Sequence, residues 1–156
     1  MKMNWKLLII CIAIPLAVGT ASALLTGGGM SVFESVNKPS LSPPSWLFPI
    51  VWTVLYTLMG ISSYLILTSG ADRDEIQNAI SIYAYQLTVN FLWPTFFFNF
   101  QWFLFSFLWL VLLFFLVAIM IREFYQISKL AAYLNIPYLM WLAFAGYLNF
   151  TIWWLN

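Results

Sequence analysis

Apolar stretches of about twenty residues alternate with short polar connections along the chain. The stretches cover five ranges: Leu7–Leu25, Trp46–Leu67, Ile76–Phe98, Phe103–Ile121 and Leu130–Leu155. A helix of about twenty apolar residues is long enough to cross the hydrocarbon core of a bilayer. The pattern therefore predicts an all-α integral membrane protein, a bundle of five transmembrane helices in which residues 1–156 form a single domain.

The composition agrees with a surface that faces lipid. The sequence is 63% hydrophobic and 7% charged, whereas a soluble domain is about 25% charged. The net charge of +1 leaves no basic surface for nucleic acid, so no nucleic-acid partner is expected. The N-terminal stretch has some features of a signal peptide, but its apolar core has the length of a span. We interpret it as a retained transmembrane helix.

The connection between the first two stretches, residues 26–45, is much longer than the others. It begins with glycines at positions 27–29 and ends with Pro39, Pro43 and Pro44. Glycine loosens a chain and proline restricts it, and loops of this length are usually functional or disordered. We expect a lid over one end of the bundle, with a plain connector as the alternative.

The positions of lysine and arginine predict the orientation in the membrane. Lys38 lies in the long connection, on one side. The other basic residues lie on the side of the N-terminus: Lys2, Lys6, Arg73, Arg122 and Lys129. Because basic residues concentrate in cytoplasmic loops, we expect the N-terminus inside and the long connection outside.

Several kinds of chemistry lack their usual residues. The chain has no histidine, and Cys11 is its single cysteine, so no metal site is expected. The interiors of the predicted spans contain no Asp, Glu, Lys or Arg, the groups on which proton relays and ion pumps depend. Conventional acid–base or metal-dependent catalysis and ion-coupled transport are therefore disfavoured.

Aromatic residues are abundant, with nine Trp, eight Tyr and fifteen Phe. Those near span ends are typical of a membrane-interface belt: Trp5, Trp46, Trp102, Trp153 and Trp154. Deeper residues form three helical faces at spacings of three and four. The faces are Phe48, Trp52 and Tyr56; Asn90, Trp93 and Phe97; and Trp141, Ala145 and Asn149.

Two of these faces contain an amide, which needs a partner in apolar surroundings. Asn90 and Asn149 could each join two helices or contact a ligand. Together the three faces indicate a mostly apolar pocket for a flat hydrophobic molecule. The first span also carries two stripes of small residues, which favour close packing within the bundle or between protomers: Ala13, Ala17 and Ala21, and Gly19, Ala23 and Gly27.

Three segments resemble the signature stretches of a known family. They are NKPSLSPPSWLFPIVWTVLYTLMG from Asn37, YQLTVNFLWPTFFF from Tyr85 and PYLMWLAFAGYLN from Pro137. The family is the TspO/MBR family of tryptophan-rich sensory and translocator proteins, which includes the mitochondrial peripheral-type benzodiazepine receptor. The resemblance covers nearly the whole chain. It implies a bacterial-type member, in the bacterial plasma membrane, with five transmembrane helices, a long loop between helices 1 and 2, and a homodimeric state.

The resemblance implies a receptor or sensor for porphyrins. Protoporphyrin IX or haem would be the ligand, with no obligatory cofactor, and synthetic benzodiazepine and isoquinoline-carboxamide ligands would bind in the same pocket. It also implies light-dependent porphyrin degradation, in which Trp141 would be photo-oxidised. A transporter of porphyrins or other hydrophobic small molecules is the alternative function.

The resemblance also assigns the ligand-binding residues by motif. They are Pro44, Trp46, Phe48, Trp52, Tyr56, Asn90, Trp93, Trp141, Phe144, Ala145 and Leu148. Two departures from the family pattern stand out. Ser40 and Leu41 occupy the place where many bacterial members have paired tryptophans. Phe150 and Trp154 replace the tyrosine and basic residue of the cholesterol-recognition pattern, so cholesterol binding is expected to be weak.

Overall fold

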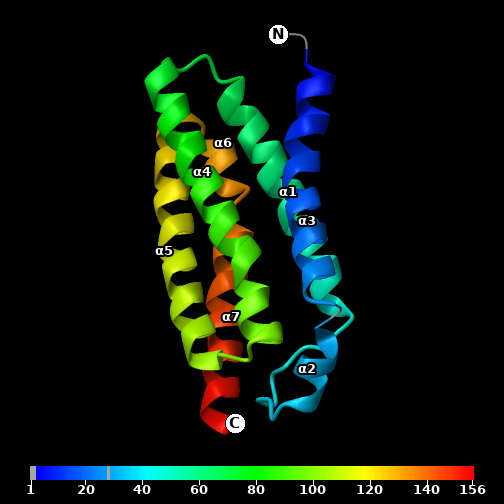
Figure 1. The fold of residues 1–156 in the computed structure, drawn as a ribbon. Coiled ribbons are helices and arrows are strands. Elements are labelled where there is room, and N and C mark those ends of the chain that lie inside the picture. The colour runs from blue at the N-terminus through cyan, green and yellow to red at the C-terminus, as the bar shows by residue number, and fades with distance from the viewer. Residues whose placement is uncertain (1–2, 28) are drawn as a thin grey trace.

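A computed structural model describes residues 3–27 and 29–156 of the chain. The regular elements in this part are all helical: α1 (Trp5–Leu25), α2 (Met30–Ser35), α3 (Leu47–Leu67), α4 (Arg73–Pro94), the π-helix η1 (Thr95–Asn99), α5 (Phe103–Ile127), α6 (Lys129–Tyr133) and α7 (Ile136–Leu155). Figure 1 shows the long helices running side by side, with α2 at the end of the bundle near the C-terminus.

The long helices α1, α3, α4, α5 and α7 correspond to the five predicted stretches, but the described residues also form the short helices α2 and α6 and the π-helix η1, so the bundle is not five simple helices. The predicted fifth span, Leu130–Leu155, is divided into α6 and α7. The backbone turns at Asn135, whose side-chain amide donates to the Ala131 carbonyl at 2.9 Å and to Ser62 Oγ at 2.7 Å. Pro137 then lies in the first turn of α7, where a missing N–H costs no hydrogen bond.

The predicted long loop contains a helix of its own, α2. Lys38 Nζ donates to the carbonyls of Phe33 at 2.7 Å and Glu34 at 3.2 Å, and Ser45 Oγ donates to Glu34 Oε1 at 2.7 Å. These bonds tie the Pro-rich segment back onto α2. The connection therefore contains a short helix that contacts the bundle, which the alternative of a plain connector does not describe.

Two other predicted boundaries also shift. The predicted fourth span ends at Ile121, but α5 continues to Ile127. The predicted third span is one helix to Phe98, but α4 ends at Pro94 and η1 follows. Pro94 has no N–H for the carbonyl of Asn90, and Ser22 Oγ of α1 donates to the neighbouring Phe91 carbonyl at 2.8 Å. The change of helix type thus coincides with a contact between α1 and α4.

Among the helices of residues 3–27 and 29–156, three are long and apolar enough to cross a membrane: α1, α3 and α5. Large apolar side chains lie exposed along α5, which is typical of contact with lipid: Leu104, Leu108, Leu112, Phe115 and Ile119. The helix α4 is less apolar overall because it carries polar residues along its length, two of which, Gln86 and Asn90, are buried inside the bundle.

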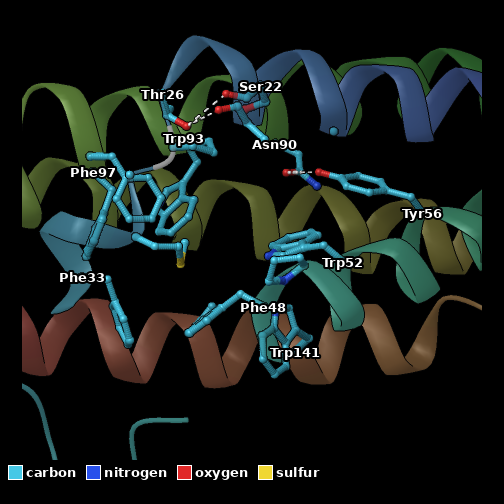
Figure 2. A pocket seen from close by; sticks show the side chains of 18 of the residues that line it. Ser22, Thr26, Phe33, Phe48, Trp52, Tyr56, Asn90, Trp93, Phe97 and Trp141 are labelled. Atoms are coloured by element: carbon cyan, nitrogen blue, oxygen red, sulfur yellow. Dashed lines mark hydrogen bonds between the residues drawn. The ribbon is translucent and has the colours of Figure 1, made fainter. Parts of the chain in front are cut away.

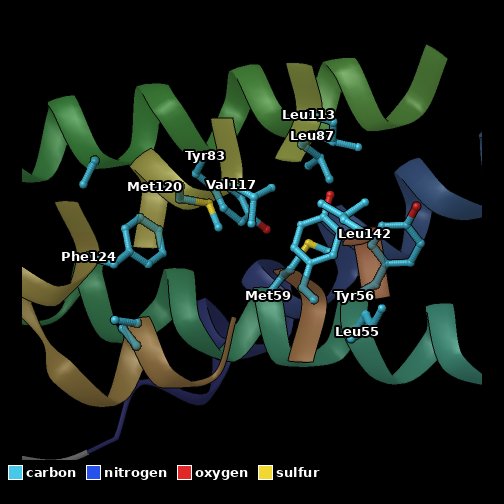
Figure 3. Packing of buried hydrophobic residues seen from close by; sticks show 14 of the residues in the cluster. Leu55, Tyr56, Met59, Tyr83, Leu87, Leu113, Val117, Met120, Phe124 and Leu142 are labelled. Carbon is cyan, nitrogen blue, oxygen red and sulfur yellow. The ribbon is translucent and has the colours of Figure 1, made fainter. Parts of the chain in front are cut away.

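The core lies between α3, α4, α5 and α7 (Figure 3). Met59, Val117 and Phe124 have no exposed surface. The helix α1 approaches α3 closely at Gly60, where a Cβ would lie 2.6 Å from the backbone oxygen of Cys11. Only glycine permits this approach, and small residues at such crossings are typical of helices packed in lipid.

Candidate functional site

A cavity of about 410 Å³ lies between the second half of α1, α2, the beginning of α3, the end of α4 with η1, and α7. Figure 2 shows its aromatic lining. Trp52 and Phe48 come from α3, Trp141 from α7, and Trp93 and Phe97 from the end of α4 and η1. Residues from the three predicted faces therefore meet around one space.

The structure brings together most of the residues assigned by motif. Eight of them line the cavity: Phe48, Trp52, Tyr56, Asn90, Trp93, Trp141, Ala145 and Leu148. Pro44, Trp46 and Phe144 are not among the lining residues. Trp46 is 65% exposed at the start of α3, as expected for an interface residue. The Phe144 ring packs behind Trp141, with the ring centroids 5.6 Å apart.

The aromatic rings hold one another in place. Trp52 stacks on Tyr56 with centroids 5.4 Å apart, and Trp93 stacks on Phe97 at 5.2 Å. Phe48 meets Trp141 edge to face at 5.8 Å. Such pairs contribute about 0.5–1.5 kcal/mol beyond the burial of their area. The packing therefore presents rigid, flat surfaces to the cavity.

Asn90 joins three helices. Its side-chain oxygen accepts from Tyr56 Oη at 3.3 Å and its Nδ2 donates to Tyr138 Oη at 2.8 Å, and Tyr138 donates in turn to Gln86 Oε1 at 2.9 Å. The amide is 3% exposed. Of the two roles open for this residue, the structure shows the helix-joining one, which also fixes the Tyr56 ring at the cavity wall.

Asn149 has a corresponding role at the other amide position. Its side-chain oxygen accepts from the indole N–H of Trp93 at 3.2 Å, and its Nδ2 donates to the Phe103 carbonyl at 2.7 Å. These bonds connect α7 to α4 and α5. The Trp93 indole is thereby held against the cavity with its donor already satisfied.

Trp141 differs from Trp93 in this respect. Its Nε1 is buried and has no hydrogen-bond partner among the residues that the structure describes. Buried donors are generally satisfied in native proteins, so each exception needs an explanation. Trp141 lines the cavity, where a ligand with a carbonyl or carboxylate could accept from this N–H.

Several lining residues were missed from the sequence, and the largest group comes from α1 and the residue that follows it. They include Leu16, Gly19, Thr20, Ser22, Ala23 and Thr26. Gly19 makes room for Tyr56, since a Cβ at position 19 would lie 2.8 Å from the Cδ2 atom of that ring. The small residues at positions 19 and 23 could have indicated that α1 lines the cavity, but their pattern predicts only close helix packing. The other stripe, Ala13, Ala17 and Ala21, is exposed.

Phe33 of α2 also lines the cavity and was not predicted from the sequence, but it comes from the long connection between α1 and α3. It is buried, packs edge to face on Phe48 with centroids 5.0 Å apart, and lines the cavity. The Lys38 ammonium lies 4.8 Å from the centroid of the same ring. The long connection thus contributes a wall of the cavity, which no periodic pattern in the sequence indicated.

The cavity also opens sideways between α1 and α3. Four of its lining residues are exposed on the outside of the bundle: Thr20 and Ala23 on α1, and Pro49 and Thr53 on α3. The two helices touch at Gly60 and Cys11, about two turns or more from these positions, and again where Gly19 meets the Tyr56 ring. The opening therefore lies on a flank of two apolar helices that are long enough to span a membrane.

The cavity contains few groups for acid–base chemistry. No Asp, Glu, Lys, Arg or Cys is among its described lining residues, and Tyr56 is its one titratable group. Within residues 3–27 and 29–156, no group of three or more His, Cys, Asp or Glu side chains could hold a metal ion. The arrangement is suited to binding an apolar, flat molecule.

The fold and the cavity define a class: an α-helical membrane protein with an aromatic-lined cavity between its helices. The family model described as the TspO/MBR family matches residues 11–155. The chain belongs to this family, as the signature stretches indicated, and it is an integral membrane protein.

Relatives in bacteria, archaea and animals align along most of the chain. The chain is 39% identical over 150 residues to tryptophan-rich protein TspO of Chlorobaculum tepidum, covering 96% of this chain and 95% of the relative. It is 37% identical over 155 residues to tryptophan-rich protein TspO of Archaeoglobus fulgidus, with 99% of each covered. It is 37% identical over 134 residues to the translocator protein of Sus scrofa, covering 85% of this chain and 79% of the relative.

Proposed function

We propose that this protein is a membrane receptor that binds a porphyrin, such as protoporphyrin IX or haem, in the cavity beneath α2. The lining of the cavity carries this proposal. Trp52, Trp93 and Trp141 surround a space that is otherwise mostly apolar, and stacking on indole rings favours a flat aromatic ligand. Synthetic ligands of the benzodiazepine and isoquinoline-carboxamide classes have the same general character.

The buried donor of Trp141 adds a point of specificity. A porphyrin with propionate groups, or a ligand with an amide carbonyl, supplies an acceptor for the indole N–H. A hydrogen bond made in apolar surroundings contributes about 0.5–1.5 kcal/mol, more when one partner is charged. The proposed ligand therefore satisfies a group that the described residues leave without a partner.

The ligand enters from the membrane in this proposal. Porphyrins partition into lipid, and the opening between α1 and α3 lies on the flank of the bundle at Thr20 and Thr53. The proposal includes five membrane-spanning helices, α1, α3, α4 with η1, α5 and α7, in a bacterial plasma membrane. The N-terminus is inside, α2 is outside, and the protein is a homodimer.

Names of relatives support a sensory or translocating role. One relative is called the tryptophan-rich sensory protein, from Cereibacter sphaeroides, and several from mammals are called translocator protein. We favour a receptor because the lining residues offer a binding surface with no ionisable relay through the bundle.

The proposal is tested by titrating the purified protein with protoporphyrin IX in the dark while following tryptophan fluorescence. Ala145 lines the cavity, whereas Ala143, on the same helix, is exposed and does not. Ala145→Phe should fill the cavity and weaken binding by about tenfold or more, and Ala143→Phe should leave binding unchanged. Equal affinity in both variants would place the porphyrin elsewhere, and no saturable quenching in the unmodified protein would overturn the proposal.

A further inference from the structure

A second hollow lies at the opposite end of the bundle, where α5 ends and α6 begins. It has a volume of about 350 Å³ and shares no lining residue with the aromatic cavity. Its polar part is formed by Arg122, Tyr125, Gln126 and Tyr133. Its apolar part includes Ala118, Ile121 and Ile136. We call it the α5–α6 groove.

The groove is positively charged. Arg122 is exposed and forms no ion pair among the described residues. Lys129 lies beside the groove, with its Nζ 5.6 Å from the centroid of the Tyr125 ring. The neighbouring carboxylate of Glu123 instead accepts from Asn78 Nδ2 of α4 at 3.3 Å, on another face of α5. The Arg122 guanidinium is therefore available to an anion from outside the chain.

The position of the groove along α5 matches the depth at which lipid headgroups lie. Arg122 follows Phe103, the first residue of α5, by about nineteen residues, which is about 28 Å along a helix. The hydrocarbon core of a bilayer is about 30 Å thick. When Phe103 lies at one boundary of this core, Arg122 therefore lies at the opposite boundary. Tyr125 and Tyr133, whose rings meet edge to face at 6.0 Å, are residues typical of that depth. Ala118 is one turn deeper, among the acyl chains.

We propose that the α5–α6 groove binds one anionic phospholipid. The guanidinium of Arg122 donates to the phosphate, a pairing that its planar geometry favours. The ammonium of Lys129 adds a second positive charge at the same level. One acyl chain lies against Ala118, Ile121 and Ile136. Basic pockets between helix ends at the cytoplasmic surface are typical sites for anionic headgroups, and this groove joins such a pocket to an apolar channel.

The experiment measures phospholipid retention by native mass spectrometry. The full chain is purified and mixed with phosphatidylglycerol or phosphatidylcholine that have identical acyl chains. We expect the anionic lipid to be retained preferentially. Arg122→Gln should reduce this preference by about fivefold, which corresponds to about 1 kcal/mol for one basic residue at the surface. The side chain is exposed, so the variant should fold, which its helical circular dichroism checks.

A matched control separates a site from general attraction. Arg73, at the beginning of α4, does not line the groove, and Arg73→Gln should retain phosphatidylglycerol as the unmodified protein does. Equal losses in the two variants, or equal retention of both lipids by the unmodified protein, would overturn the proposal. So would displacement of the lipid by an equal concentration of glycerol phosphate, which has no acyl chain. Porphyrin titration should be unaffected by Arg122→Gln, because Arg122 does not line the aromatic cavity, so this proposal and the proposed function fail independently.

Discussion

The side-chain amide of Asn156 pairs in both directions with the backbone of Asn37. Its Oδ1 accepts from the Asn37 N–H at 3.0 Å, and its Nδ2 donates to the Asn37 carbonyl at 3.0 Å. This pair connects the end of α7 to the segment between α2 and α3. Since Phe33 and Met30 of α2 line the cavity, the pair holds one wall of the cavity in place.

Asn156→Ala should therefore loosen α2 and the segment that follows it. Each lost hydrogen bond contributes about 0.5–1.5 kcal/mol, so we expect amides in residues 30–46 to exchange with deuterium about tenfold faster. Bound porphyrin should also dissociate faster. Thr151→Ala removes a hydroxyl one turn earlier on α7 that bonds only its own helix, and it should change neither rate. Unchanged exchange in Asn156→Ala would show that the pair does not hold α2.

Gly60 and Gly146 offer a matched pair of glycine substitutions. A Cβ at Gly60 meets the backbone of α1, whereas one at Gly146 meets nothing within 4 Å. Gly60→Ala should lower the free energy of unfolding by about 1–3 kcal/mol through overpacking. Gly146→Ala should raise it by about 0.5–1 kcal/mol through the entropy of the unfolded chain. Thermal unfolding in detergent measures both, and equal effects would contradict the close contact of α1 and α3.

We expect Trp141 to have a photochemical role in addition to its proposed contact with the ligand. Trp141→Phe keeps most of the stacking surface but is much harder to oxidise. Dark binding should remain within about tenfold, or 1.4 kcal/mol, while light-dependent breakdown of bound porphyrin is largely lost. Bleaching under fixed illumination, normalised to occupancy, measures this.

Trp153→Phe serves as the control for Trp141→Phe. Trp153 is on the same helix but does not line the cavity, so its substitution should leave bleaching unchanged. If bound porphyrin bleaches at the original rate in Trp141→Phe, the role of Trp141 is limited to packing in the bundle and binding the porphyrin.

The route from the membrane predicts an effect on association kinetics. Thr53→Trp places a large side chain at the opening between α1 and α3 and should slow porphyrin association from lipid vesicles by roughly tenfold, or about 1.4 kcal/mol in the barrier. Val54 is the next residue of α3, is exposed, and does not line the cavity. Val54→Trp should associate at the original rate, and equal rates for both variants would exclude entry at this opening.

The orientation is tested with single cysteines at Ser40 and Ala71 in a Cys11→Ser background. Labelling whole cells with an impermeant maleimide should modify position 40, after α2, and leave position 71, before α4, unmodified. The expectation follows from the excess of Lys and Arg on the side of position 71. The reverse labelling pattern would show that the N-terminus is outside.

The sequence by itself determined the helical membrane class, the family and three aromatic faces. The class and the faces depend on local periodicity, whereas the family was indicated by three signature stretches. A helix of about twenty residues that are apolar on all sides has few alternatives to a bilayer. The faces at Trp52, Trp93 and Trp141 were predictable because residues spaced by three and four share one side of a helix.

Only the tertiary structure decided which helix approaches these faces and what their polar groups do. The sequence contains Asn90 and Asn149, but whether their amides join helices or meet a ligand depends on partners far along the chain, such as Tyr138 and Phe103. The wall formed by α1 follows from its close approach at Gly60. The wall formed by Phe33 follows from how the long connection folds back on the bundle. Crossing distances and nonlocal hydrogen bonds leave no periodic trace in a sequence, which is why these contributions emerged only from the packing of the helices.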